Sequence, residues 1–312
     1  MTAAAEFAAG PLRPGQTDAV LGLIQAAADA DGVDPLSEHG LLRLRHGDPG
    51  HGSDVLATAD GQVAGYAYLD EPDPAEGSEV TGELVVHPGH RRKGVGAALA
   101  RELLARAQGH PVRVWAHGDL AAAAALARSA RFERFRALWQ MRRPLPQGGP
   151  GGGLPPEDNE PPEVAFPAGT TLRTFRPGQD EDEWLRLNAR AFAKHPEQGS
   201  WTRRDVELRE NEPWFDPAGF FIAEHDGAMT GYHWTKVHPD GLGEVYVVGV
   251  DPDAHGGGLG KALTAAGLRY LRDRGLPEVL LYVDEENTAA ISMYQHLGFT
   301  RWRADAMYRR PG

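Results

Sequence analysis

The stretch Val-Gly-Val-Asp-Pro-Asp-Ala-His-Gly-Gly-Gly-Leu-Gly at residues 248–260 runs from an apolar strand, through a glycine-rich turn, toward a helix. A stretch of the same design, Val-Val-His-Pro-Gly-His-Arg-Arg-Lys-Gly-Val-Gly, occupies residues 85–96. Glycine in such a turn lets backbone N–H groups approach an anion, and the start of the following helix adds a partial positive charge. Neither turn matches the dinucleotide fingerprint or the phosphate loop, which disfavours NAD and ATP. Two turns in register therefore predict a phosphate-bearing ligand of another kind.

The elements around the two turns recur at a nearly constant distance along the chain. Asp60-Gly61 and Asp226-Gly227 each lie between short β-prone runs, which predicts two hairpins. The two hairpin glycines are 166 residues apart, whereas Pro88 and Pro252, which follow the next apolar strand, are 164 apart. This small drift predicts one fold that is used twice.

A segment rich in Pro and Gly, residues 144–167, separates the two copies. It includes Gly148-Gly149-Pro150-Gly151-Gly152-Gly153, a composition that cannot bury a core and is typical of a linker. We therefore expect an N-terminal domain at 1–143 and a C-terminal domain at 168–312.

The composition excludes several classes of function. The 312 residues carry a formal net charge of −12, so the basic surface on which nucleic-acid binding depends is not expected. No stretch approaches the roughly 20 apolar residues of a membrane span, and the first residues lack the pattern of a signal peptide; together these predict a cytoplasmic protein without membrane contact. The chain has no cysteine, which excludes disulfides, thiolate metal sites and a cysteine nucleophile. Neither the His-Glu-x-x-His spacing of a zinc helix nor a Gly-x-Ser-x-Gly elbow is present, so neither a metal site nor a serine hydrolase is predicted.

Two motifs resemble the GNAT acetyltransferase superfamily. Arg91–Gly96 is similar to its acyl-CoA pyrophosphate signature, Arg/Gln-x-x-Gly-x-Gly/Ala, and Asn287–Phe299 is similar to the later motif Asn-x-x-Ala-x-x-x-Tyr-x-x-x-Gly-Phe. The second turn departs from the signature, because His255 stands where the family has Arg or Gln. The resemblance implies an α/β fold of two tandem GNAT-type domains, each a mostly antiparallel twisted sheet flanked by helices. It also implies acetyl-CoA as the acetyl donor, without a metal.

The resemblance carries over a set of residues that would contact acetyl-CoA. They lie on the strand, the glycine turn and the helix start of each copy, and on the helix that begins after Asn287. In the N-terminal copy they are Leu84, Val85, Val86, Arg92, Lys93, Gly94, Val95, Gly96 and Ala97. In the C-terminal copy they are Val248, Gly249, Val250, His255, Gly256, Gly257, Gly258, Leu259, Gly260, Lys261, Asn287, Thr288, Ala289, Ala290, Ile291 and Ser292.

The two copies differ in catalytic equipment. Acetylation of an amine needs a base for the ammonium proton and an acid for the leaving thiolate. Glu244 stands just before the strand at 245–250, where a GNAT base reaches the amine, and Tyr294 lies two helical turns after Asn287. The first copy holds Ala127 at the position that matches Tyr294. We therefore expect a catalytic C-terminal domain and a degenerate N-terminal one; the structural alternatives are a solvated Glu244 and a core-packed Tyr294.

Within the superfamily, Ala193–Gly199, Thr235–Pro239 and residues 243–252 are similar to one group of tandem-domain enzymes. This resemblance implies transfer of an acetyl group to the cysteinyl amine of a glucosaminyl-inositol, a small-molecule substrate, by a monomer. It carries over five substrate ligands, of which the first two also fit an ordinary solvated helix surface: Glu38, Glu183, Lys236, Glu244 and Tyr282. Two other functions stay open: a tandem GNAT enzyme that acts on an aminoglycoside, a polyamine or a protein N-terminus, and a non-catalytic acyl-CoA sensor.

Overall fold

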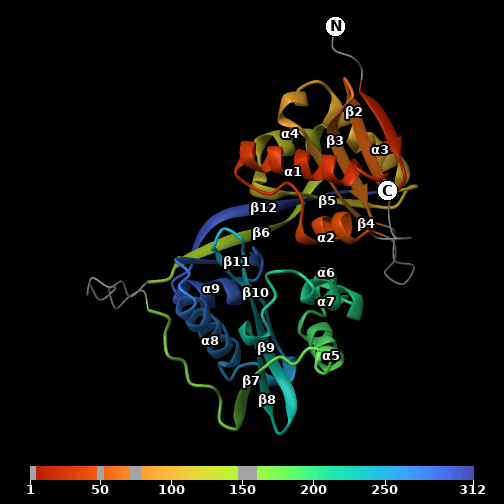
Figure 1. Cartoon of the computed structure of the whole chain (residues 1–312). Coiled ribbons are helices and arrows are strands. Elements are labelled where there is room, and N and C mark those ends of the chain that lie inside the picture. Colours follow the sequence, from red (N-terminus) through yellow and green to blue (C-terminus); the bar gives the residue numbers. More distant parts are fainter. Residues whose placement is uncertain (1–4, 48–52, 71–78, 147–159) are drawn as a thin grey trace. The chain divides into compact units, whose positions relative to one another are not determined.

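The chain forms two compact units, which the computed structural model describes over residues 5–47, 53–70, 79–146 and 160–312 (Figure 1). Unit 1 comprises the residues up to Leu138 together with Arg303–Gly312, and unit 2 comprises Trp139–Trp302. Because the last residues of the chain belong to unit 1, the predicted boundaries at 143 and 168 describe repeats along the chain rather than these compact units. Part of the predicted linker, residues 147–159, lies outside the described residues.

Unit 1 is built on one sheet with the strand order β1-β2-β3-β4-β5-β12. Strands β4 and β5 are parallel, and the other neighbouring pairs are antiparallel. The last strand of the chain pairs with β5 through Ala306–Arg310 and so completes this sheet. The elements are β1 (Glu6–Ala9), α1 (Gln16–Asp31), α2 (Glu38–His46), β2 (Ser53–Ala59), β3 (Gln62–Leu69), β4 (Val80–Val86), η1 (Pro88–His90), α3 (Val95–Arg106), β5 (Val112–Ala116), η2 (His117–Asp119), α4 (Ala121–Ser129) and β12 (Thr300–Arg310).

Unit 2 repeats this plan with the strand order β6-β11-β10-β9-β8-β7. Strands β10 and β11 are parallel, whereas β7, β8, β9 and β10 form an antiparallel run. The elements are β6 (Glu133–Pro144), β7 (Thr170–Thr174), α5 (Glu181–Ala191), α6 (Pro196–Gly199), α7 (Arg203–Glu210), η4 (Pro217–Gly219), β8 (Phe220–His225), β9 (Ala228–Val237), β10 (Gly243–Val250), η5 (Pro252–Ala254), α8 (Leu259–Asp273), β11 (Glu278–Asp284) and α9 (Thr288–His296). Residues 133–138 of β6 count with unit 1, and residues 300–302 of β12 count with unit 2.

The two predicted hairpins are confirmed. Asp60 and Gly61 have φ angles of 52° and 76°, and Asp226 and Gly227 have φ angles of 50° and 80°. Positive φ at both central residues is the requirement of a type I′ turn, which Asp-Gly meets at low cost and which matches the twist of the paired strands. Local chemistry therefore fixes the register of β2 with β3 and of β8 with β9.

Each sheet is covered by helices on both faces, because successive side chains of a strand point in opposite directions. In unit 1, β4 contributes Leu84 and Val86 to the apolar cluster of α3, and Val85 to the cluster of α1. In unit 2, β10 contributes Val248 to the cluster of α8 and α9, and the preceding Val247 to the cluster of α5. The predicted α/β fold of two similar domains is confirmed. Within the described ranges, none of the helices has the length and apolarity to cross a membrane.

Candidate active site

The parallel strands of unit 2 separate part of the way along their length. Strands β10 and β11 pair only through Gly243–Val245 and Val279–Leu281, whereas β10 stays paired with β9 as far as Val250. Beyond this point, the edge of residues 247–250 that faces β11 has no strand partner within the described ladder. The predicted cofactor residues Val248, Gly249 and Val250 therefore line an opening between two strands.

A β-bulge lies at the start of this opening. The register between β9 and β10 shifts between Val245 and Val247, so Tyr246 is the extra residue. A bulge leaves the extra residue outside the ladder and re-aims the local backbone. The matching strands of unit 1 also separate, after Val80–Gly82 and Val112–Val114, but β3 and β4 pair there without a shift. The bulge thus distinguishes unit 2 from unit 1.

The two glycine-rich turns adopt the same backbone conformation. Gly94 and Gly258 are the N-caps of α3 and α8, with φ angles of 87° and 80° and no capping side chain. Two residues earlier, Arg92 and Gly256 have φ angles of 62° and 87°. The carbonyl oxygens of Gly94 and Gly258 accept hydrogen bonds from the amides of Ala98 and Ala262, as in any α-helix. The amides before Ala98 and Ala262 therefore have no acceptor within the helix and point outward from its start. This arrangement suits a pyrophosphate.

His255 fills the place of the Arg that the signature expects. Its Nε2 lies 3.1 Å from the carbonyl oxygen of Val250. In unit 1, Arg91 Nε donates a hydrogen bond of 3.3 Å to the carbonyl oxygen of Val86. Both side chains reach back five residues and tie the turn to the end of the preceding strand. The departure from the signature therefore preserves the contact.

Glu244 is buried at the start of β10. Its side chain is 7% exposed, and its Oε2 lies 2.7 Å from His238 Nε2. In the β9–β10 ladder its direct partner is Lys236, and directly opposed residues project from the same face of a sheet. The alternative of a solvated carboxylate at the strand start is therefore wrong.

Aromatic rings hold Lys236 on this face. Its Nζ lies 4.5 Å from the ring centroid of Trp214 and 5.1 Å from that of Tyr246. The Tyr246 hydroxyl accepts a 2.7 Å hydrogen bond from Arg209 Nε, and this guanidinium stacks 3.9 Å from Trp201. The bulge residue Tyr246 is therefore held in place by a hydrogen bond from α7 and by packing against the neighbouring aromatic rings and Lys236.

Tyr294 packs in the core on the opposite face of the sheet, as the structural alternative for this residue expected. It is buried in the apolar cluster that contains Val245 of β10 and Val283 of β11, with its ring edge-on to Phe299. Burial raises the pKa of Tyr294 to about 12. Asn287 caps α9 by accepting a hydrogen bond from the amide of Ala290. Glu244, in the paired part of β10 just before the opening, and Tyr294 therefore lie on opposite faces of this sheet.

The other predicted substrate ligands are spread over the fold. Tyr282 follows the last paired residue of β11, is 44% exposed and accepts a 2.8 Å hydrogen bond from Gln140 Nε2. Glu183 on α5 accepts a hydrogen bond from the amide of Met229, at the opposite end of β9 from Lys236. Glu38 is the first residue of α2 and belongs to unit 1. Of the predicted ligands, the structure pairs only Glu244 and Lys236 directly within the described ladders.

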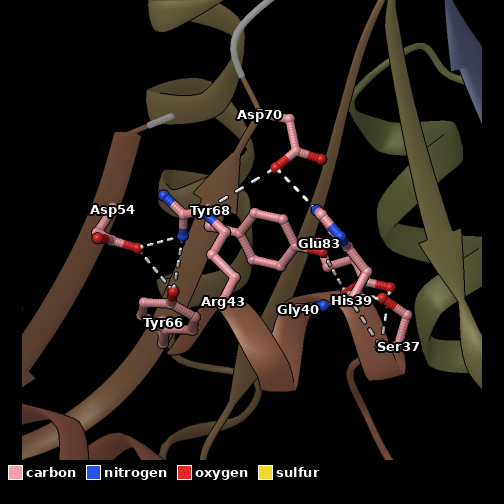
Figure 2. A network of polar contacts seen from close by, with 9 residues as sticks. All are labelled: Ser37, His39, Gly40, Arg43, Asp54, Tyr66, Tyr68, Asp70 and Glu83. Carbon is pink, nitrogen blue, oxygen red and sulfur yellow. Dashed lines mark hydrogen bonds and ion pairs between the residues drawn. The ribbon is translucent and has the colours of Figure 1, made fainter. Parts of the chain in front are cut away.

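In unit 1, the corresponding face of β4 carries a closed polar network (Figure 2). Glu83 stands opposite Tyr68, where unit 2 has Val247 opposite Trp234. Its carboxylate accepts hydrogen bonds from the Ser37 amide and hydroxyl and from the Tyr68 hydroxyl, and it lies 2.9 Å from His117 Nε2. Beside it, Arg43, Asp54 and Tyr66 form a second buried cluster, which Figure 2 also shows. The Glu83 carboxylate therefore stabilises the fold of unit 1 and is not placed to act as a catalytic base.

Sequence reasoning missed three residues of these sites. His238 lies within the segment Thr235–Pro239 that carried the narrower resemblance, and His117 lies within Trp115–Gly118, which is similar to the same group, so a signal was present for both. Arg209 had none, because its partner Tyr246 lies far away in the sequence. Among the described residues, no group of three or more His, Asp or Glu side chains could hold a metal ion.

The fold and the two glycine turns define a class of protein. The model of the acetyltransferase (GNAT) family matches residues 23–131 and 182–299, so this chain belongs to the GNAT acetyltransferase family. Enzymes of this class use acetyl-CoA as the acetyl donor, and the uncapped starts of α3 and α8 suit its pyrophosphate.

Two relatives of this chain identify a narrower group within the family. A mycothiol acetyltransferase from Thermomonospora curvata is 57% identical over 296 residues, which cover 95% of this chain and 94% of that protein. A mycothiol acetyltransferase from Thermobispora bispora is 56% identical, with coverage of 95% and 97%. Within the GNAT family, the chain groups with the mycothiol acetyltransferases.

Solved structures agree with the fold. A GCN5-related N-acetyltransferase from Sphaerobacter thermophilus aligns with a TM-score of 0.69 and 27% identity, over 98% of this chain and 95% of that one. A tandem GNAT protein from the clavulanic acid biosynthesis pathway aligns with a TM-score of 0.73 and 22% identity, over 99% and 98%. The second likeness concerns the fold alone.

Proposed function

We propose that unit 2 transfers an acetyl group from acetyl-CoA to the cysteinyl amine of the cysteinyl glucosaminyl-inositol precursor, the last step of mycothiol biosynthesis. One observation carries the assignment to unit 2: its separated strands have a bulge at Tyr246 and a buried carboxylate beside it. In the described residues of unit 1, β3 and β4 pair there without a shift, and Glu83 is held by Ser37 and Tyr68. The relatives at 56–57% identity carry the name mycothiol acetyltransferase, which supports mycothiol as the product.

Acetyl-CoA supplies the thioester, with its electrophilic carbonyl carbon and a thiolate leaving group. In this proposal, the amides at the start of α8, residues 259–261, and the turn glycines hold the pyrophosphate, and His255 fixes the turn. The open edge of residues 248–250 pairs with the pantetheine arm. In the same proposal, Asn287, the N-cap of α9, and the following residues 288–292 contact acetyl-CoA.

Glu244 acts as the base in this proposal. It takes a proton from the substrate ammonium: an N–H bond breaks, an O–H bond forms on the carboxylate, and the nitrogen lone pair becomes free to attack the thioester carbon. The new C–N bond forms and the C–S bond breaks, so that sulfur leaves with the electron pair. The attacking nitrogen gives up its second proton to this leaving thiolate, so that CoA departs as the thiol. Lys236 stands opposite Glu244, where its charge suits the hydroxyl groups of a sugar.

Tyr294 assists the leaving sulfur. Because the pKa of its hydroxyl is about 12, the phenol stays protonated at physiological pH. An ordinary thiol has a pKa of roughly 8.5, so a thiolate is too weak a base to remove this proton completely. Tyr294 therefore acts as the acid by donating a hydrogen bond to the departing sulfur.

Further details extend the proposal. Glu38, Glu183 and Tyr282 bind hydroxyl or amino groups of the substrate. Unit 1 binds acetyl-CoA without turnover, through Leu84–Val86 and Arg92–Ala97. The enzyme works as a monomer in the cytoplasm, away from membranes and nucleic acid.

The test is the release of CoA thiol from acetyl-CoA with a panel of amines. The panel contains the cysteinyl glucosaminyl-inositol with its sulfur blocked, free cysteine, glucosamine and an aminoglycoside. Strong preference for the first amine is expected. Turnover of another amine alone would keep the GNAT chemistry and overturn the substrate, and acetyl-CoA binding without turnover of any amine would indicate a sensor.

A further inference from the structure

His238 is held rigidly at the turn between β9 and β10. Its amide donates a 2.8 Å hydrogen bond to the carbonyl oxygen of Leu242, and its own carbonyl accepts one of 2.9 Å from the amide of Gly241. The following Pro239 restricts His238 to extended backbone conformations. Gly241 supplies a φ of 82°, and the carboxylate of Asp240 accepts a hydrogen bond from the Leu242 amide. The turn therefore fixes the backbone of His238, from which the imidazole side chain projects.

The ring makes one short polar contact with the predicted base. His238 Nε2 lies 2.7 Å from Glu244 Oε2, and the two side chains are 28% and 7% exposed. An ionised carboxylate can only accept, so Nε2 carries the hydrogen and donates it. Hydrogen bonds to a charged partner are short and strong, as this one is.

A carboxylate at a strand start needs such a partner to be useful as a base. The terminal torsion of Glu has a broad energy profile, so the carboxylate plane is not fixed by its own rotamer. The aromatic-bound Lys236 stands across the ladder, and Asp240 lies in the turn. Within the described residues, the 2.7 Å contact with His238 is the hydrogen bond that the structure gives the Glu244 carboxylate, and the imidazole that makes it is fixed by the turn.

We propose that His238 is the positioning residue of Glu244: it holds Oε2 and so sets the orientation in which the carboxylate meets the substrate amine. This inference rests on the proposed function, since it assumes that Glu244 is the base. It assigns His238 a role in the rate of proton removal rather than in the affinity for acetyl-CoA.

Two substitutions separate this role from a structural one. His238→Ala removes the donor, whereas His238→Gln keeps an N–H donor close to the position of Nε2. We expect His238→Ala to lower kcat by about 10- to 100-fold, because small misplacements of a catalytic group cost that much. His238→Gln should stay within about threefold of the wild type, and the KM for acetyl-CoA should not change in either variant. His225→Gln, at the far end of the β8–β9 hairpin, is the matched control.

A double-mutant cycle with Glu244→Gln completes the test. If His238 acts through Glu244, His238→Ala has little further effect on kcat once Glu244→Gln is present. Additive losses, or a His238→Ala variant with at least half of the wild-type kcat, would overturn the inference. Glu244→Gln with unchanged kcat would instead overturn the proposed role of Glu244, so the two failures are distinguishable.

Discussion

The imidazole of His117, whose side chain is 13% exposed, ties the last strand of the chain into unit 1, and its removal should loosen that strand. His117 Nε2 lies 2.9 Å from Glu83 Oε1, and its Nδ1 lies 3.1 Å from Asp305 Oδ2. Asp305 also accepts a 2.7 Å hydrogen bond from the amide of Gly118. Burial alone would lower the pKa of His117, but the hydrogen bonds and charges of Asp305 and Glu83 raise it to about 10. The ring is therefore an imidazolium between two carboxylates.

The magnitude follows from this geometry. Removing one member of a buried ion pair costs about 3–5 kcal/mol, because the remaining charges stay buried without compensation. A pKa raised from 6.5 to about 10 corresponds to roughly 5 kcal/mol in favour of the charged ring, which is the same order. We expect His117→Ala to destabilise the pairing of β12 with β5 by about 3 kcal/mol or more.

The pH dependence has a definite sign. Since the pKa of His117 is raised on folding, its contribution is complete below pH 6.5 and is lost as the pH rises through 10. Burial alone would raise the pKa of Glu83, but the hydrogen bonds and charge of His117 hold this pKa below its ordinary value. The Glu83 carboxylate therefore stays charged until low pH, and the ion pair with His117 keeps its contribution to stability down to that range. The difference between wild type and His117→Ala should therefore be largest near pH 6 and small above pH 10.

Amide hydrogen exchange of the last strand provides the assay. The amides of Ala306–Arg310 that pair with β5 should lose protection by about 100-fold or more in His117→Ala near pH 6. His225→Ala, which removes a half-exposed histidine of unit 2, serves as the control and should leave this protection unchanged. Loss of less than about fivefold, or a loss of the same size at pH 10.5, would refute the reasoning.

Three further perturbations probe unit 2. A Cβ at Gly267 would lie 2.0 Å from the buried ring of His233, so Gly267→Ala should cost about 1–3 kcal/mol of stability in urea unfolding, and a cost below about 0.5 kcal/mol would contradict the packing. His255→Arg should keep the KM for acetyl-CoA within about twofold of the wild type, because Arg91 makes the same backbone contact in unit 1. His255→Ala should raise this KM several-fold, because the contact is lost. If steady-state assays give the two variants the same KM, the contact has no role in binding acetyl-CoA. Tyr294→Phe should lower kcat by about 100-fold with an unchanged circular dichroism spectrum, and a kcat near that of the wild type would show that sulfur leaves without its help.

Local signals in the sequence predicted much of the fold. The Asp-Gly pairs gave both hairpins because positive φ at two successive residues is a local requirement. The glycine turns indicated where α3 and α8 begin, which is at Val95 and Leu259 in the structure. Each helix begins directly after its left-handed glycine, since that residue is the N-cap.

Long-range pairing could not be predicted in the same way. Nothing local to residues 306–310 indicates that they complete the sheet of unit 1 rather than that of unit 2. The bulge at Tyr246 and the histidine beside Glu244 depend on how two strands and their turn are aligned, which the spacing of motifs does not contain. The burial of Glu244 was likewise open from the sequence, because a carboxylate at a strand start is more often solvated.

The central claim, that the glycine turn of unit 2 serves catalysis and that of unit 1 does not, is tested most directly by one matched pair of variants. Gly258→Asp and Gly94→Asp place the same negative charge at the N-cap of α8 or α3, at φ angles of 80° and 87°. The measurement is the initial rate of CoA release with the cysteinyl glucosaminyl-inositol amine. We expect Gly258→Asp to lose about 10- to 100-fold in kcat/KM for acetyl-CoA, because its carboxylate repels the pyrophosphate and occupies the helix amides, while Gly94→Asp keeps at least half of the activity. Equal losses, or a loss confined to Gly94→Asp, would contradict the account.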